Sequence, residues 1–255
     1  MRHARLLSLL YLMLLWTSLH AQAGVVLVPV LAQQSLPPKW VNHNGRAEGV
    51  CPDILAAMER AEPRLRFTGQ NDFRSVPMIE SALETGRIGA ACALLDTPLR
   101  QRVARRLEPP LYISRQRVAV AADDTASINS LDDLVQLNSL VTTSRGAGFA
   151  DELRQRGLQV DDSTGDNLVN LKKILAGHGR FFYMNELTLN WLVREEGLHD
   201  KVRILPAVLH EQPIYFWISR KTAPDTARLI EGALAKVRAN GELVRIFERW
   251  NSSGP

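Results

Sequence analysis

The stretch IGAACALLDTPLR, residues 88–100, indicates the fold more clearly than any other part of the sequence. It begins with an uninterrupted apolar run at 88–95, which is typical of a parallel strand covered on both faces. Asp96, Thr97 and Arg100 follow that run directly. Ligands of open α/β sheets bind outside the carboxyl ends of the strands, so these three polar side chains are expected near a ligand.

Strand and helix patterns alternate on both sides of this stretch. Residues 25–31 form an apolar, β-branched run that predicts a buried strand, and Gly49 to Asp53 opens a helix with proline in its first turn. Further strands are expected at 65–67, 118–121, 140–142, 181–184 and 213–219, and further helices at 76–83, 130–134, 149–157, 168–175, 187–196 and 225–250, the last broken at Gly241. This alternation predicts an α/β protein.

The pattern occurs twice, which predicts two lobes, each with a central, mostly parallel sheet flanked by helices. We expect the first lobe to comprise residues 24–117 and 214–255, and the second lobe residues 118–213. The sequence contains no Gly/Ser-rich linker between them. Two strands that act as a hinge are therefore the expected connection.

Residues 1–23 have the order of a secretory signal peptide. Arg2 and Arg5 give a positive start, residues 6–16 are almost entirely apolar, and Ala21-Gln22-Ala23 resembles a cleavage site. The apolar run is short for a membrane span, although an N-terminal anchor helix is the alternative interpretation. We therefore expect a periplasmic protein.

The remaining composition argues against several classes of function. Without residues 1–23 the chain has 29 basic and 27 acidic residues, a net charge of +2, and the two signs are interleaved. This is not the basic patch of a nucleic-acid-binding protein. The histidines are not at metal-ligand spacing and no CxxC or HExxH occurs, so we expect no metal, no cofactor and a monomer.

Cys51 and Cys92 are the two cysteines. In an oxidising compartment such a pair is a candidate disulfide, and two buried free thiols are the alternative. A bridge would attach the first helix to the strand at 88–95. Its role would be structural, because no third cysteine is available to exchange with it.

Several short motifs, taken in order, resemble the family 3 extracellular solute-binding proteins, in their amino-acid-binding branch with the type II periplasmic-binding fold. The motifs are Pro37-Pro38-Lys39-Trp40, Gly49 with Asp53, Leu83-Glu84-Thr85-Gly86, Thr97-Pro98-Leu99-Arg100, Pro110-Leu111-Tyr112 and the glycine-broken tail at 237–250. The resemblance covers nearly the whole chain after residue 23. It implies capture of a small polar ligand, an amino acid or a related carboxylate, by hinge closure, followed by delivery to an inner-membrane ABC-type permease or a sensor.

The resemblance also assigns roles in the first lobe. The arginine of T-x-x-R holds the ligand carboxylate in this family, and here it is Arg100; a guanidinium is a planar two-pronged donor that suits a carboxylate. Thr97 or Asp96 would add a polar contact, and Trp40 would stack on the ligand. The alternatives are a surface role for Arg100 and a core role for Trp40.

In the second lobe, Ser144, Arg145 and Gly146 lie between a strand and a helix. Free N–H groups at a helix N-terminus attract anions, so this turn is a candidate ligand contact; an ordinary capped turn is the alternative. Asn185 and Glu186 would suit the ammonium group of an amino acid.

The sequence departs from the family pattern at two places. Gly89 stands where members usually have an acid, and residues 177–180 replace a glycine–basic–x–Asp element. These departures favour, as the second interpretation, a stand-alone receptor or interaction module with a degenerate pocket. A periplasmic dehydratase-type enzyme is a third, with Glu186 or Asp96 as the acid or base. We expect no enzymatic activity.

Overall fold

The structure is a computed structural model that describes residues 24–34, 36–145 and 149–252, so the expected signal peptide and Gly146 lie outside the described residues. The helices are α2 (Val50–Ala61), α3 (Val76–Thr85), α4 (Pro98–Val103), α5 (Leu131–Leu137), α6 (Ala150–Gln155), α7 (Asn167–Leu175), α8 (Glu186–Glu195), α9 (Pro224–Ala239) and α10 (Glu242–Asn251). The strands are β1 (Val26–Pro29), β2 (Ala32–Gln33), β3 (Val41–His43), β4 (Arg46–Glu48), β5 (Leu65–Thr68), β6 (Phe73–Arg74), β7 (Ala90–Leu95), β8 (Ala104–Ala121), β9 (Val141–Thr142), β10 (Val160–Asp161), β11 (Phe181–Asn185), β12 (Val202–Ile204) and β13 (His210–Ser219). Within these ranges, none of the helices has the length and apolar character that a membrane crossing needs.

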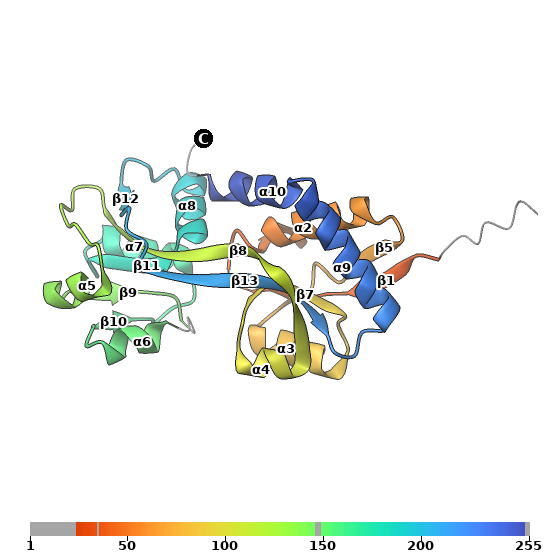
Figure 1. The fold of residues 1–255 in the computed structure, drawn as a ribbon. Helices are drawn as coiled ribbons and strands as arrows, with labels where there is room; N and C mark the ends of the chain where they lie inside the picture. Colours follow the sequence, from red (N-terminus) through yellow and green to blue (C-terminus); the bar gives the residue numbers. More distant parts are fainter. Residues whose placement is uncertain (1–23, 35, 146–148, 253–255) are drawn as a thin grey trace, which may run out of the picture.

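Two long strands, β8 and β13, connect the two halves of the molecule (Figure 1). They pair antiparallel with each other, and their sheet has the order β10-β9-β11-β8-β13-β7, with β12 also on β8. The first half contains β1–β7, α2–α4, α9 and α10, and the second half contains β9–β12 and α5–α8. The α/β architecture is therefore as predicted, with a mixed rather than mostly parallel main sheet.

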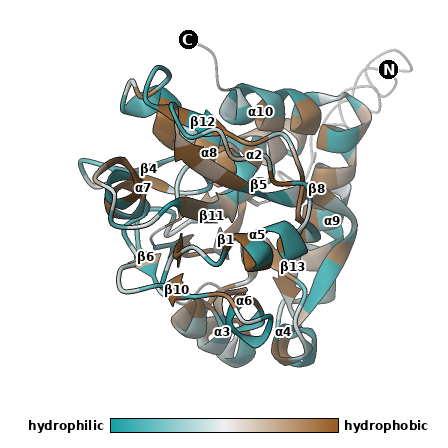
Figure 2. Cartoon of the chain, turned by 90° about the vertical axis from the view of Figure 1, so that its left-hand side faces the viewer, coloured by the Kyte–Doolittle hydropathy of each residue, from teal (hydrophilic) through white to brown (hydrophobic). Residues whose placement is uncertain are grey.

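Each half has its own hydrophobic core on both faces of its strands. In the second half, Phe181 and Tyr183 of β11 belong to one buried cluster, while the intervening Phe182 and Met184 belong to another. Side chains of a strand alternate between its faces, so β11 is covered by apolar residues on both sides. Figure 2 shows the apolar colour along this strand and the polar colour on the outer loops.

The direction of β7 differs from the prediction. The strand is buried along nearly its whole length, as its apolar run predicts, but it pairs antiparallel with β13 (Ile214 opposite Leu95, Ile218 opposite Ala90). A continuous apolar run reports that both faces of a strand are covered. It carries no information about the direction of the neighbouring strand.

The helix ends follow local sequence signals. Helix α3 ends at Gly86, which has φ 75°, and α9 is separated from α10 by Gly241, which has φ 74°. Ser130 and Asp133 form a capping box on α5. Strand β8 is much longer than the predicted 118–121. The sequence did not indicate its first part, because that part is half-exposed and contains prolines and charged residues that interrupt the apolar pattern of a strand.

Helix α8 of the second half contacts the first half on one side of the junction. Leu187 is buried among the apolar residues of the first half, and the Thr188 hydroxyl donates to the Pro37 carbonyl at 2.7 Å. The Asn190 side chain donates to the Asn251 carbonyl of α10 at 2.9 Å. The loop before Lys39 and the end of α10 therefore both lie against α8.

Candidate functional site

Arg100 lies where the strand pattern placed it, just beyond the carboxyl end of β7. The Thr97 hydroxyl accepts a hydrogen bond from the Arg100 N–H at 3.2 Å and so caps α4, which begins with Pro98. This short helix turns the Arg100 side chain back toward the strand. Only 4% of Arg100 is exposed, so it is not a surface arginine.

The Arg100 guanidinium has three neighbours. Its Nη2 donates to Glu80 Oε1 at 2.7 Å, its Nη1 donates to the Leu95 carbonyl, and the group lies over the Trp217 ring at 5.7 Å. Burial lowers the pKa of Arg100, and the Glu80 carboxylate opposes that effect. Among the described residues Arg100 Nε has no partner, so part of its five-donor fork is unused.

Lys39 is a second buried cation beside Arg100. Its side chain is 6% exposed, and its Nζ donates to the Ala93 carbonyl at 2.8 Å. Burial, together with the positive charge of Arg100, lowers the pKa of Lys39 from its ordinary 10.5 to about 7. Lys39 was not among the residues predicted from the sequence, although its position between a proline and a tryptophan is an unusual place for a lysine; both neighbours are buried in the structure.

A distortion of β7 supplies the carbonyl that Lys39 contacts. Ala93 has φ 59°, and the register between β7 and β13 shifts at this point. The carbonyl groups of three successive residues, Ala93, Leu94 and Leu95, accept hydrogen bonds from Lys39, Trp217 and Arg100. The end of β7 thus holds both cations through main-chain carbonyl oxygens.

The main chain of Lys39 is held by the start of α2. The Cys51 N–H donates to the Lys39 carbonyl at 3.1 Å. Gly49 has φ 125°, and a Cβ there would lie 2.3 Å from the Pro38 carbonyl oxygen, so only glycine permits this approach.

A Cys51–Cys92 disulfide joins the start of α2 to β7, with Cα atoms 5.8 Å apart. The expected bridge is therefore present. The bridge connects Cys51, whose N–H holds the main chain of Lys39, to Cys92, which directly precedes Ala93.

The other predicted contacts of the first half are engaged within the protein. Trp40 is 2% exposed and belongs to the core of the first half, so at this step of the loop it is Lys39, and not Trp40, that reaches the end of β7, through the Ala93 carbonyl. Asp96 pairs with Arg106, and the Thr97 hydroxyl caps α4. Glu80, which the sequence analysis missed, is the carboxylate that contacts Arg100.

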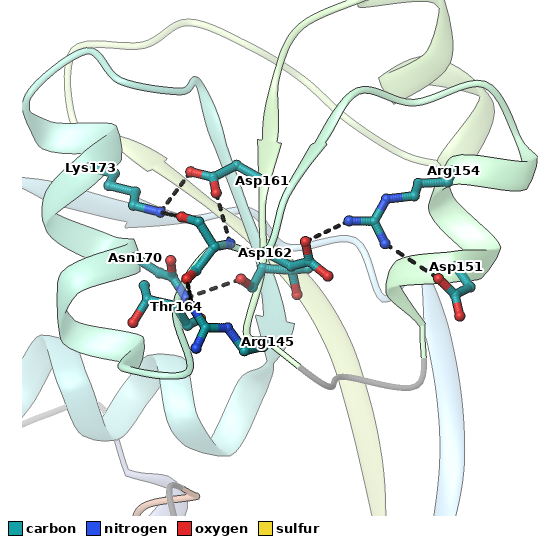
Figure 3. A network of polar contacts seen from close by, with 10 residues as sticks. Arg145, Asp151, Arg154, Asp161, Asp162, Thr164, Asn170 and Lys173 are labelled. Atoms are coloured by element: carbon teal, nitrogen blue, oxygen red, sulfur yellow. Dashed lines mark hydrogen bonds and ion pairs between the residues drawn. The ribbon is translucent and has the colours of Figure 1, made fainter.

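Ser144 and Arg145, two predicted contacts of the second half, contact residues of their own half. Arg145 donates to the Ser163 carbonyl in a polar network that also pairs Lys173 with Asp161 at 2.6 Å (Figure 3). The Ser144 hydroxyl donates to the Gly165 carbonyl at 3.4 Å.

Helix α8 uses the remaining two predicted contacts. Asn185 caps it by accepting from the Thr188 N–H at 2.9 Å, and Glu186 pairs with Arg117 at 2.9 Å. The carboxylate expected to receive an ammonium group is therefore already neutralised by an arginine.

A separate hollow of about 640 Å³ lies in the first half, between the β3–β4 hairpin, the start of α2 and α10. Its lining includes Asp53, whose carboxylate accepts from the Trp250 indole at 2.5 Å. Asp53 thus attaches α10 to α2. No group of three or more His, Cys, Asp or Glu residues in the described part of the chain is arranged to hold a metal ion.

Residues 28–253 match the bacterial extracellular solute-binding proteins, family 3. No curated protein sequence is similar enough to the chain to count as a relative.

Solved structures are similar in fold. A probable amino-acid ABC transporter extracellular-binding protein from Bacillus subtilis has a TM-score of 0.75 at 14% identity, covering 89% of this chain and 98% of that one. A histidine kinase sensor domain with similarity to periplasmic binding proteins has a TM-score of 0.70 at 18% identity, covering 90% and 97%. An ancestral amino acid-binding protein, a precursor of cyclohexadienyl dehydratase, has a TM-score of 0.67 at 16% identity, covering 88% and 94%.

Proposed function

Because the chain belongs to the bacterial extracellular solute-binding proteins of family 3, we propose that it captures a small polar carboxylate in the periplasm and presents it to an ABC-type transporter. The ligand-binding role follows from the family. The carboxylate, the compartment and the transporter are our proposals. A stand-alone receptor is the second candidate, and the similarity of fold to a histidine kinase sensor domain supports it.

The proposal rests on the burial of Arg100 and on its Nε, which is unpartnered among the described residues. The Arg100 guanidinium is buried at the end of β7, and its Nε donor is used by no described residue. A buried donor without a partner is costly, and a carboxylate is the group whose shape and charge match a guanidinium. A ligand carboxylate at this position would satisfy Arg100.

Hinge motion about β8 and β13 is the proposed route of capture. These two strands connect the halves, and we place the lobes at residues 24–117 with 214–255 and at residues 118–213. The contacts of α8 with Pro37 and Asn251 hold one side of the junction. A ligand that contacts both lobes would shift the population toward a closed state by the difference between its affinities for the two states.

Isothermal titration calorimetry against small carboxylates tests the proposal. Arg100→Lys keeps the positive charge beside Glu80 but removes the planar fork, and it should weaken binding by about tenfold or more. Arg102→Lys is the matched control, because Arg102 is exposed on the same helix. Undiminished affinity in Arg100→Lys would show that this guanidinium does not hold the ligand.

Chromatography of each acid after incubation with the protein tests the enzymatic alternative. Recovery of the unchanged acid is expected for a binding protein. A new product that depends on Glu186 or Asp96 would instead support the dehydratase-type interpretation.

A further inference from the structure

We propose that Lys39 is a second ligand-binding cation beside Arg100, and that the preferred ligand is a small carboxylic acid without an ammonium group. This inference rests on the proposed function and specifies its ligand class.

The charges around the site favour an anion over a zwitterion. Lys39 and Arg100 are both more than nine-tenths buried, and Glu80 is the carboxylate that contacts Arg100. The next acid, Asp96, pairs with Arg106. The two buried cations are therefore opposed by one carboxylate in direct contact and by the nearby charge of Asp96, which Arg106 already balances. A ligand ammonium would add a third positive charge among poorly solvated groups.

The hydrogen-bonding groups point the same way. The carbonyl oxygens of Ala93, Leu94 and Leu95, which could accept from an ammonium, already accept from Lys39, Trp217 and Arg100. Donors are in surplus, since Lys39 uses one of its three N–H groups on Ala93 and Arg100 Nε is unpartnered among the described residues. Because the cations have unused N–H donors while the carbonyl acceptors next to them are occupied, the site suits a carboxylate, which only accepts hydrogen bonds.

In the described part of the second half, the two side chains expected to receive an ammonium group are already engaged. Glu186 is paired with Arg117, and the Asn185 side chain caps α8. Lys39, by contrast, lies next to the junction, because Pro37 of the same loop accepts a hydrogen bond from Thr188 of the second half. We place the ligand at this junction, next to the loop that carries Lys39.

Matched pairs of acids that differ only in the amino group provide the test. We expect calorimetry with the wild-type protein at pH 6.5 to show tighter binding of propionate than of alanine, of succinate than of aspartate, and of glutarate than of glutamate. In Lys39→Met, which is similar in size but uncharged, affinity for the preferred acid should fall at least about 30-fold. Lys172→Met, an exposed lysine of α7, is the control and should bind as wild type.

The outcomes separate this inference from the proposed function. Tighter binding of the amino acid in each pair would overturn the inference and leave the proposed function intact, and the wild-type comparison gives this answer even if Lys39→Met does not fold. Unchanged affinity in a folded Lys39→Met protein would also overturn it. Failure of the wild-type protein to bind any acid of either set would overturn both.

Discussion

Replacing Lys39 by methionine should change how the stability of the fold depends on pH. The Lys39 side chain is buried, and its pKa falls from 10.5 to about 7 in the folded state. The folded state therefore disfavours the charged form, and the unfolded chain binds the proton more tightly. Between pH 7 and 10.5 the unfolded chain carries more protons, so the wild-type fold gains stability as pH rises through that window.

The size of the effect follows from the same pKa values. A displacement from 10.5 to about 7 corresponds to a penalty on the order of 5 kcal/mol below pH 7, where Lys39 is charged in both states. Lys39→Met removes that penalty but leaves the Ala93 carbonyl without its donor, which costs about 1–3 kcal/mol. The variant should therefore be a few kcal/mol more stable at pH 6. Its advantage over wild type should shrink by about 3 kcal/mol between pH 6 and pH 9.

Urea unfolding followed by tryptophan fluorescence at pH 6, 7, 8 and 9 measures this difference. Tyr112 and Tyr183 do not interfere, because burial raises the pKa of both phenols above the ordinary value for tyrosine and so beyond the range of the assay. Lys172→Met should show no change in pH dependence. If the difference in unfolding free energy between wild type and Lys39→Met stayed constant across this pH range, the lowered pKa of Lys39 in the folded state would be disproved.

Three further predictions concern residues around the site and the junction. Glu80→Gln removes the carboxylate that opposes Arg100 and should tighten carboxylate binding about threefold to tenfold in calorimetry; weaker binding would show that Glu80 orients Arg100 rather than competes with the ligand. Replacing Cys51 and Cys92 together by alanine opens a loop with a sequence separation of 41 residues and should lower the unfolding free energy by about 3–4 kcal/mol in urea titrations, whereas an unchanged midpoint would contradict a stabilising bridge. Leu187→Ala should cost about 2–4 kcal/mol, because this side chain is buried in the first half; a loss below about 1 kcal/mol by thermal unfolding would show that α8 is not firmly attached there.

The fold could be predicted where local chemistry decides it. Capping at Ser130, the glycines that end α3 and separate α9 from α10, and the apolar run of β7 were each sufficient to place an element. The position of Arg100 followed from its place after a buried strand. The direction of β7 and the length of β8 could not be predicted, because both depend on pairing with the distant strand β13.

The site could be predicted only in part, because its partners are distant in sequence. Trp40 and Lys39 are adjacent, and the backbone of the loop decides which of them enters the core and which approaches Arg100. Glu80 reaches Arg100 from another helix, across 20 positions of sequence. Residue type alone suggested Glu186 for an ammonium group, but its pairing with Arg117 became apparent only with the two side chains placed.

The Cys51–Cys92 bridge completes a closed circuit around Lys39. Starting at the Lys39 main chain, the circuit passes through the N–H of Cys51, across the sulfur atoms to Cys92, on to the Ala93 carbonyl and back to Lys39 Nζ. Cleavage of the bridge by a thiol would remove the one covalent link that joins these two hydrogen bonds across the core, so α2 and β7 would be free to move apart on either side of the lysine.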